Sequence, residues 1–447
     1  MIIKNKAELA TTKLRKQTLD IIEAGINRVL PSIIMKSAVK YDAASRVTSI
    51  NGDHYRISKG RVFVIGGGKA SGLMAETLES IIYPKNIADG VVNCKSSRYK
   101  TSKTKIIPAG HPLPDQRGID GVKKMLALKA RHSITENDLV ICLISGGGSA
   151  LMPYPVDEVS LADKQSITES LLSSGAEIDE INTVRKHLSQ IKGGRLGHFY
   201  SPATVVSLIL SDVVGNNLSA IASGPTSPDP TTFQDAYNVL KRYDLLDKAP
   251  KAVTDFLRNG CQGKVAETPK TLDNCCNYII GDNRLALESM LSRANEMVRK
   301  PYIVTAEQKG DTATVAISRA QEILNMKYTG YDTILIGGET TPKLPAAAGR
   351  GGRNQHYAAV SMQAMRQYRD QWVIASVGTD GSDFLPDVAG AIVDNNSLDN
   401  AKAKGIDVPS YLKRYDSNTL LDKIGDSLVI TGDTGTNVGD VIIYLLG

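Results

Sequence analysis

Six short apolar runs dominate the hydropathy pattern of this chain, and each one ends in a polar turn, most of them rich in glycine. Unbroken runs of this length are typical of strands that are buried on both faces, as in a parallel sheet. The runs are Arg61–Ile65, Leu139–Ile144, Val205–Leu210, Thr333–Ile336, Trp372–Val377 and Ser427–Ile430.

Helical spacing of apolar residues separates several of these runs. It predicts helices over residues 14–30, 70–82, 160–172, 178–192, 283–298, 311–326 and 355–368. Strands that alternate with helices in this way indicate the α/β class with a mostly parallel sheet. Ligands of such sheets bind beyond the carboxyl ends of the strands, where the polar turns would gather.

The chain of 447 residues is longer than one ordinary domain, so we expect two. The pattern changes after a long polar stretch between Gly215 and Pro230, which places a domain boundary near 230–245. A polar loop of this length in a compact protein is often functional.

Composition narrows the class of protein. Hydrophobic residues make up 42 % and charged residues 22 %, as in a globular protein, and the net charge of +6 comes from Lys and Arg spread along the chain. This distribution argues against nucleic-acid binding. No apolar run approaches the ~18 residues of a membrane span, and the N-terminus lacks a signal-peptide core. Five cysteines without C-x-x-C spacing fit a reducing compartment, so we expect a soluble cytoplasmic protein.

The first glycine turn, Gly66–Lys69, resembles two nucleotide-binding motifs without matching either. A Walker A loop would need Gly at Phe63 and Ser or Thr at Ala70, and the dinucleotide fingerprint would need Gly at Ser71. The turn could simply connect a strand to a helix and carry a surface lysine. We favour an anion site, because Lys69 would stand at the electropositive N-terminus of a helix.

The second glycine turn carries the stronger signal. Its donors are the backbone N–H groups and hydroxyls of Ser145, Gly146, Gly147, Gly148 and Ser149. Such donors before a helix suit a carboxylate or a phosphate. Ser149 as a nucleophile is the rival interpretation, but the Gly-x-Ser-x-Gly elbow of hydrolases is absent.

A third candidate is the loop Gly349–Gln355, in which Arg350 and Arg353 stand among glycines. Guanidinium groups match carboxylate and phosphate geometry and keep their charge. An exposed basic loop is the alternative, but the glycines would let the loop close on a ligand.

Acidic and hydroxyl residues follow the later strands. They suit Mg²⁺ with a nucleotide triphosphate, although ordinary Asx turns explain them equally well. Asp212 and Glu339 follow strands too and are further candidates for a metal ligand or a base. The candidate residues are rich in hydrogen-bond donors for anions and include neither a His triad nor a thiol nucleophile. Such a set is typical of phosphoryl transfer. The two acidic loops are Gly378–Asp383, with Asp380, Gly381 and Asp383, and Gly432–Asn437, with Asn437.

From about residue 15 to the C-terminus the chain resembles the glycerate 2-kinase family (class II, with a MOFRL-type C-terminal part). The motifs that carry the resemblance are Ile65–Ala70, Gly110–Asp115, Leu143–Leu151, Ile181–Ser189, Ser211–Val213, Ala222–Thr226, Gly351–Gln355, Gly378–Gly381 and Thr434–Val438.

This resemblance implies ATP-dependent phosphorylation of the 2-hydroxyl of D-glycerate with Mg²⁺, giving 2-phosphoglycerate and ADP. It also implies a larger, Rossmann-like three-layer domain made of residues 1–240 with 405–447, a smaller α/β domain of residues 241–404, and a site in the cleft between them. The family's catalytic lysine matches Lys69, its catalytic arginine matches Arg353, and Ser145–Ala150 matches a substrate-binding segment. The oligomeric state stays open, a homodimer included.

Our hypothesis assigns a role to each candidate. Ser145–Ser149 and Arg353 hold the glycerate carboxylate and developing charge, Lys69 neutralises the transferring phosphoryl group, and Asp212 orients the attacking hydroxyl. The residues expected to bind the nucleotide or its metal are Gly337, Gly338, Glu339, Asp380, Gly381, Asp383 and Asn437.

Three alternatives remain at this stage. The chain could phosphorylate another sugar acid, it could be an NAD(P)H-dependent hydroxypyruvate reductase, or it could be a nucleotide sensor without catalysis. The absent third glycine after Lys69 argues against the reductase.

Overall fold

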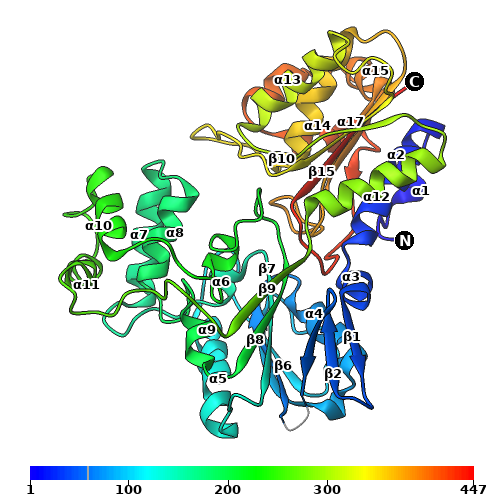
Figure 1. Cartoon of the computed structure of the whole chain (residues 1–447). Coiled ribbons are helices and arrows are strands. Elements are labelled where there is room, and N and C mark those ends of the chain that lie inside the picture. Colours follow the sequence, from blue (N-terminus) through cyan, green and yellow to red (C-terminus); the bar gives the residue numbers. More distant parts are fainter. Residues whose placement is uncertain (58–59) are drawn as a thin grey trace. The chain divides into compact units, whose positions relative to one another are not determined.

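The computed structural model describes residues 1–57 and 60–447, and these form two compact units (Figure 1). The first unit consists of residues 34–280. The second joins the first 33 residues of the chain to residues 281–447. We call them the central unit and the terminal unit, and each is described by itself.

The central unit contains a six-stranded sheet in the order β6-β5-β4-β7-β8-β9. Neighbouring strands from β6 to β8 are parallel, and every residue of β4 and β7 is buried, as expected for apolar runs covered on both faces. The strands are β4 (Val62–Gly67), β5 (Ile87–Cys94), β6 (Thr104–Pro108), β7 (Leu139–Ser145), β8 (Thr204–Leu210) and β9 (Cys275–Gly281).

An antiparallel three-stranded sheet precedes this sheet in the chain. It consists of β1 (Val39–Asp42), β2 (Val47–Ile50) and β3 (Asp53–Arg56). The helices from α3 to α9 are α3 (Pro31–Ala38), α4 (Ser71–Ile82), α5 (Gln116–His132), α6 (Gly148–Leu151), α7 (Leu161–Ser173), α8 (Ile178–His187) and α9 (Arg195–Tyr200).

Part of the central unit is a helical lobe with its own core. Helices α7 and α8 lie side by side there with α10 (Phe233–Arg242) and α11 (Lys251–Cys261) (Figure 1). Phe233 and Phe256 meet edge to face with ring centroids 5.8 Å apart at the centre of this lobe.

The terminal unit contains a mixed sheet in the order β10-β11-β15-β12-β13-β14. Side chains alternate between its two faces: Ile334 and Ile336 face one core, whereas Leu335 faces the other. The strands are β10 (Pro301–Gln308), β11 (Thr333–Gly338), β12 (Trp372–Gly378), β13 (Gly390–Asp394), β14 (Leu428–Val429) and β15 (Asp440–Leu446).

Helices cover both faces of the mixed sheet. Helices α2 and α12 contribute to one core, and α13, α14 and α17 to the other. The helices of this unit are α1 (Lys6–Leu9), α2 (Lys13–Arg28), α12 (Asn283–Glu296), α13 (Thr312–Leu324), α14 (Arg353–Ala364), α15 (Asn395–Ala403), α16 (Val408–Lys413) and α17 (Ser417–Ile424), with a 3-10 turn at Met365–Gln367. The 3-10 turns Pro84–Asn86 and Ile221–Ser223 belong to the central unit.

The α/β class and the central strands of both sheets are confirmed, but two local predictions need correction. The helix expected over 178–192 ends at His187, and Gly194 instead precedes α9 with a left-handed φ of +82°. The runs at β11 and β12 are buried as expected, yet β15 lies antiparallel between them, so this sheet is mixed rather than parallel.

The domain division also differs from the prediction. The chain divides near residues 33 and 280 rather than near 230–245, and the C-terminal segment stays with residues 281–404 because β15 pairs with β11 and β12. Only the first 33 residues cross from the N-terminal part. Strand partners are chosen by long-range packing, which the local hydropathy pattern does not record.

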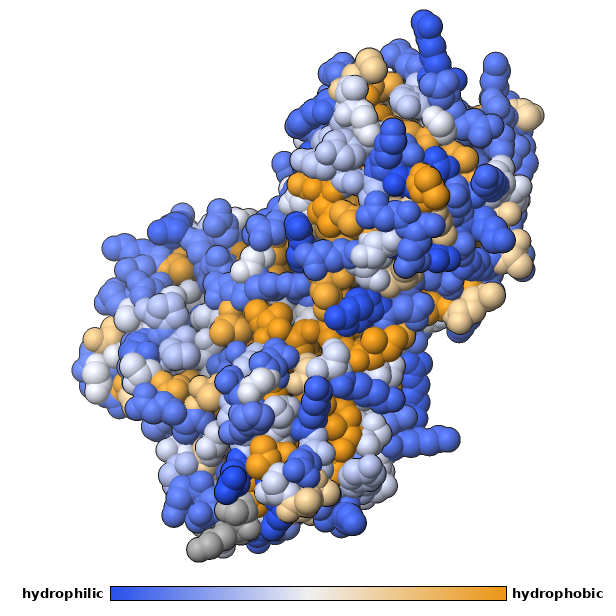
Figure 2. Space-filling model, turned by 45° about the vertical axis from the view of Figure 1, so that its right-hand side comes forward, coloured by the Kyte–Doolittle hydropathy of each residue, from blue (hydrophilic) through white to orange (hydrophobic). Residues whose placement is uncertain are grey.

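The surface shown in Figure 2 is mostly hydrophilic, and its apolar side chains lie in groups interrupted by polar ones. Among the described residues, no helix combines the length and the hydrophobicity needed to cross a membrane.

Candidate functional site

In the central unit, the two glycine turns are joined to one another. They follow the adjacent strands β4 and β7, and the backbone N–H of Lys69 donates to the carbonyl of Gly146 at 2.8 Å. Gly68 has a φ of +156°, and an added Cβ would lie 2.2 Å from the Ser145 hydroxyl oxygen. Only glycine fits such an approach. The Lys69 side chain runs beside Gly147, where an added Cβ would lie 3.2 Å from Lys69 Cγ.

The hydroxyl of Ser145, which we expected to donate a hydrogen bond to a ligand, contacts the first glycine turn instead. This hydroxyl is buried, accepts a hydrogen bond from the Ala70 N–H at 2.9 Å and lies 3.4 Å from the Ser71 hydroxyl. The Ser145 side chain therefore connects the two turns and helps to hold Lys69 beside the second loop.

We expect Ser145→Ala to lower the free energy of unfolding by about 1–3 kcal/mol, because the buried Ala70 N–H would lose its acceptor. Urea denaturation measures this change. Ser166→Ala, on an exposed position of α7, is the matched control. Equal stability of the two variants would contradict a connecting role for Ser145.

The far end of the second glycine loop is fixed by residues that the sequence analysis did not select. Ser149 shares a 2.8 Å hydrogen bond with Ser223, whose hydroxyl donates to Asn182 on α8. Lys192 is fully buried and donates to the carbonyl of Gly148 at 2.9 Å. Burial lowers the pKa of Lys192 well below that of an ordinary lysine. A lysine directly before Gly193-Gly194 was the only signal in the sequence.

In the terminal unit, Arg353 begins α14 and is held by two carboxylates. Its Nε and Nη2 donate to Asp440 at 2.6 and 3.1 Å, and its Nη1 donates to Glu339 at 2.5 Å. Although burial opposes the charge, these carboxylates raise the pKa of Arg353, so it stays charged. Among the described residues, three of the five N–H groups of Arg353 have partners in this way. Two N–H groups are left for a ligand.

The carboxylate of Asp383 accepts hydrogen bonds from the first turn of α14. Its two oxygens accept hydrogen bonds from the backbone N–H groups of Asn354 at 3.0 Å and Gln355 at 2.8 Å. Burial raises the pKa of Asp383 to about 6. This carboxylate caps the first turn of α14, and its binding of nucleotide or metal stays a prediction.

Asp440 is the acidic residue that the sequence analysis missed. It begins β15, is buried, and contacts both Arg353 and the Asn354 amide. Its signal in the sequence is a lone carboxylate directly after Gly439, at the start of an apolar run.

The remaining predicted nucleotide residues lie in two loops that touch each other. Asp380 accepts from the Ser382 N–H at 2.9 Å, as in an Asx turn, and an added Cβ at Gly381 would lie 1.9 Å from the carbonyl of Gly432. The Thr434 N–H donates to the carbonyl of Asp380, which connects this loop to the one that carries Asn437.

Gly337 and Gly338 are placed by close packing. An added Cβ would lie 1.7 Å from Asn283 Oδ1 at the first position and 2.3 Å from the Gln308 nitrogen at the second. Close packing therefore explains why glycine occupies both positions. Asp212 follows β8 and is partly exposed. It belongs to the central unit, whereas Arg353 belongs to the terminal unit.

A buried histidine on α14 makes the stability of the protein depend on pH. His356 is 3 % exposed and lies 2.8 Å from the Ser417 hydroxyl through Nδ1, and burial lowers its pKa from 6.5 to about 4. The unfolded chain therefore binds this proton more readily than the folded one. Its stabilising contribution is complete above pH 6.5 and is lost as the pH falls toward 4.

The expected loss is about 3 kcal/mol over this pH range. We expect His356→Gln to flatten the decrease in unfolding free energy between pH 6.5 and 4, measured by urea denaturation at several pH values. His54→Gln, at an exposed position, is the control. An unchanged slope in His356→Gln would contradict the assignment.

Among the described residues there is no group of three His, Cys, Asp or Glu side chains that could hold a metal ion. Mg²⁺ commonly binds through one or two carboxylates together with substrate phosphates, and Glu339 and Asp380 supply carboxylates of this kind at strand ends. The residues therefore fit a metal that arrives with its nucleotide, not a preformed metal cage.

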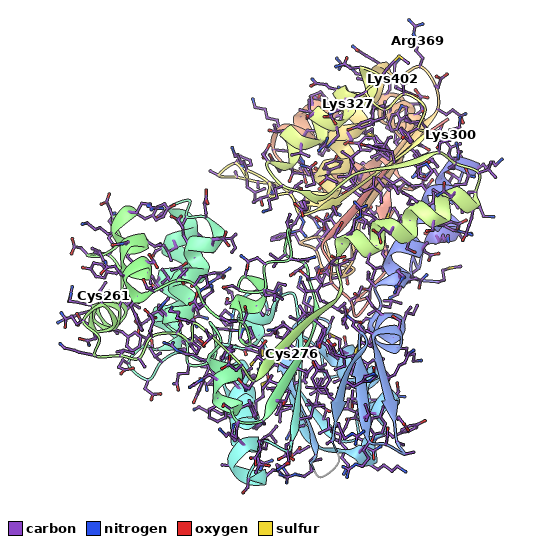
Figure 3. All side chains as sticks on the ribbon, in the orientation of Figure 1. Cys261, Cys276, Lys300, Lys327, Arg369 and Lys402 are labelled. Atoms are coloured by element: carbon purple, nitrogen blue, oxygen red, sulfur yellow. The ribbon has the colours of Figure 1, made fainter. Side chains whose placement is uncertain are left out.

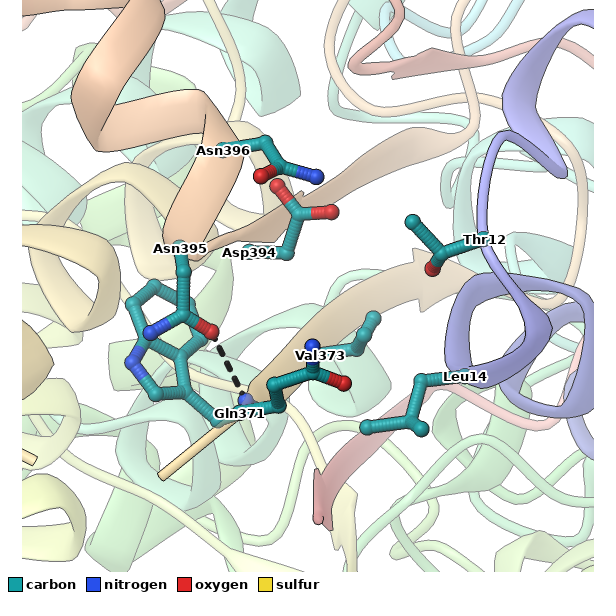
Figure 4. Close-up of a pocket in the computed structure, with 8 residues that line it drawn as sticks. Thr12, Leu14, Gln371, Val373, Asp394, Asn395 and Asn396 are labelled. Carbon is teal, nitrogen blue, oxygen red and sulfur yellow. Dashed lines mark hydrogen bonds between the residues drawn. The ribbon is translucent and has the colours of Figure 1, made fainter. Parts of the chain in front are cut away.

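A small pocket of about 50 Å³ lies at the other end of β12 from Arg353 (Figure 4). It contains the start of β12, where the Trp372 N–H donates to Asn395 at 2.8 Å. Since β12 spans about 20 Å, this pocket is remote from the Arg353 cluster. Its size suits a water molecule rather than a nucleotide.

The four cations labelled in Figure 3 all belong to the terminal unit, toward the top of the view. Lys300, Lys327, Arg369 and Lys402 are exposed and come from different segments of the chain. Cys261 and Cys276 belong to α11 and β9, and neither forms a disulfide.

Comparisons with known proteins cover nearly the whole chain. The family described as "Domain of unknown function (DUF4147)" matches residues 17–258, and the MOFRL family matches residues 332–440. The Glycerate 2-kinase of Pyrococcus horikoshii is 40 % identical over 442 residues, which cover 96 % of this chain and 98 % of the relative. The D-glycerate 2-kinase of Thermotoga maritima is 36 % identical, with 97 % and 98 % covered. The crystal structure of a glycerate kinase from Thermotoga maritima matches with a TM-score of 0.82 at 36 % identity, over 97 % of this chain and 99 % of that chain.

Proposed function

Because this chain belongs to the glycerate 2-kinase family, we propose that it transfers a phosphoryl group from ATP to the 2-hydroxyl of D-glycerate, giving 2-phospho-D-glycerate and ADP. The hydroxyl oxygen attacks the γ-phosphorus of ATP. The bond between the γ-phosphorus and the oxygen that bridges it to the β-phosphorus breaks, and ADP leaves with that oxygen. The hydroxyl proton passes to a base.

The observation that carries this proposal is the arrangement at Arg353. Asp440 and Glu339 fix the guanidinium and keep it charged, while two N–H groups remain for an anion. Phosphoryl transfer is accelerated mainly by positioning and by stabilising charge on the equatorial oxygens, and a fixed guanidinium supplies both.

In the central unit, Lys69 supplies an ammonium group next to a loop whose backbone is fixed by hydrogen bonds. The hydrogen bonds from Lys69 and Ala70 to Gly146 and Ser145 hold the two turns together, so little reorganisation accompanies ligand binding. We propose that Lys69 neutralises the phosphoryl group and that Gly146–Ser149 contact the sugar acid. Asp212 remains our candidate for orienting the hydroxyl.

Glu339 and Asp380 are the proposed carboxylate partners of the Mg²⁺ that accompanies ATP. When bound, the ion neutralises charge on the phosphates. The protein residues orient this complex, and Asn437 lies in the adjoining loop as a further nucleotide contact.

Release of ADP from ATP and D-glycerate, followed with a coupled enzyme assay, tests the function directly. We expect activity with D-glycerate and less with other sugar acids such as 2-keto-3-deoxygluconate, and phosphorus NMR should identify the 2-phosphate. Oxidation of NADH by hydroxypyruvate, without release of ADP from ATP and D-glycerate, would overturn the kinase assignment in favour of the reductase.

A further inference from the structure

A cluster of cations in the central unit has no part in the mechanism above. We call it the cationic cluster and define it as Lys164, Arg185, Lys192 and Arg195. It lies where α7 packs beside α8, next to the Ser145–Ser149 loop (Figure 1).

Helix geometry places Arg185 on the face of α8 that is connected to that loop, and Lys164 on the inward face of α7. Arg185 lies one turn after Asn182 on the same face of α8, and Asn182 accepts from Ser223, which is bonded to Ser149. On α7, Lys164 lies one turn before the buried Ile167, so it shares the face that packs inward. Both cations are partly buried.

The other two members are already satisfied by backbone carbonyls. Lys192 donates to Gly148 at 2.9 Å, and Arg195 donates to Ser189 at 2.6 Å and to Ala266 at 3.2 Å. These bonds fix the positions of both side chains, and the nearby carboxylates Glu267 and Asp229 favour the charged form of Arg195.

The side chains of Lys164 and Arg185 have no hydrogen-bond or carboxylate partner within residues 1–57 and 60–447. The two nearby carboxylates act on Arg195, and their hydrogen-bonded partners are other residues. Asp229 pairs with Lys186 at 3.1 Å, and Glu267 lies 3.0 Å from His187.

This arrangement is unfavourable for the protein alone. Burial and the neighbouring charges of Arg185 and Arg195 lower the pKa of Lys164 to about 7. Like charges held together with incomplete hydration raise the free energy of the folded state until an anion joins them. Such strain at one place in a fold is a feature of binding sites.

We propose that Lys164 and Arg185 bind the carboxylate of the sugar acid beside Gly148 and Ser149, and so select hydroxy acids over neutral polyols. A guanidinium pairs with a carboxylate through two parallel N–H···O bonds, and the ammonium adds a second charge. This inference rests on the proposed function, because it names how the substrate of that reaction is recognised.

Binding of D-glycerate without nucleotide tests the inference separately from catalysis. Isothermal titration calorimetry should show at least tenfold weaker binding for Lys164→Met and for Arg185→Gln than for the wild type. Arg185→Lys, which keeps the charge but not the guanidinium, should fall between. Arg258→Gln, at an exposed position on α11, is the matched control and should bind normally.

The melting temperature of the unliganded protein gives a readout that a structural role would not produce. Removing an uncompensated partly buried charge should leave the Tm of Lys164→Met unchanged or higher, while binding weakens. A lower Tm with normal binding of D-glycerate would overturn the proposal.

Competing ligands separate the two anionic groups that the cluster could bind. Lactate carries a carboxylate and no phosphate, whereas glycerol 3-phosphate carries a phosphate and no carboxylate. We expect lactate to compete with D-glycerate and glycerol 3-phosphate not to. The reverse result would overturn the assignment of the carboxylate, as would a wild-type protein that does not bind D-glycerate.

The outcomes also separate this inference from the function. A wild type that binds D-glycerate through this cluster but does not consume ATP would refute the kinase proposal alone. Variants that phosphorylate D-glycerate with an unchanged KM would refute the inference alone.

Discussion

Arg353→Ala is expected to reduce kcat for D-glycerate phosphorylation by about 10³-fold or more, which is the range in which arginines contribute to phosphoryl transfer. The guanidinium is fixed by Asp440 and Glu339, so its two remaining N–H groups are already oriented when the anion arrives. The loss should therefore fall on kcat more than on KM for ATP.

Removal of Arg353 also leaves the buried Asp440 without its counter-charge, which lowers stability. Arg353→Lys separates the two effects, since it retains a cation near Asp440 but cannot reproduce the paired N–H geometry. We expect this variant to fold and to remain at least about 10²-fold impaired. Arg366→Ala, at an exposed position just after α14, is the control. Near-normal turnover by folded Arg353→Lys and Arg353→Ala would refute the site.

Lys69→Ala is expected to reduce kcat by about 10²–10³-fold with a Tm close to that of the wild type. The backbone of Lys69 holds the turn through its bond to Gly146, and this bond does not depend on the side chain. Alanine therefore removes the ammonium group while the two glycine turns stay joined.

The comparison variant for Lys69→Ala is Lys85→Ala, which removes an exposed lysine from the same unit. Steady-state kinetics with D-glycerate and thermal melting of both proteins complete the experiment. If Lys69→Ala kept wild-type kcat, neutralisation of the phosphoryl group by this lysine would be excluded.

The sequence located the loops of the candidate site better than it assigned their roles. Lys69 follows a glycine turn after a buried strand, and Arg353 begins a helix after a glycine-rich loop, and both patterns can be recognised locally. Their roles in catalysis stay predictions. Asp383 illustrates the limit: its surroundings make it a cap for α14, whereas its sequence context suggested a ligand. Asp440 and Lys192 were missed because their partners are distant in the chain.

By itself, the sequence determined the α/β class, the buried strands and the positions of the glycine turns that follow them, since hydrophobic period and glycine position are local properties. Only the tertiary structure decided that β15 lies between β11 and β12 and that the first 33 residues join the C-terminal part. It also decided which charges are paired and which are left unpaired. These features depend on free energies shared between residues hundreds of positions apart, and a local pattern carries no record of them.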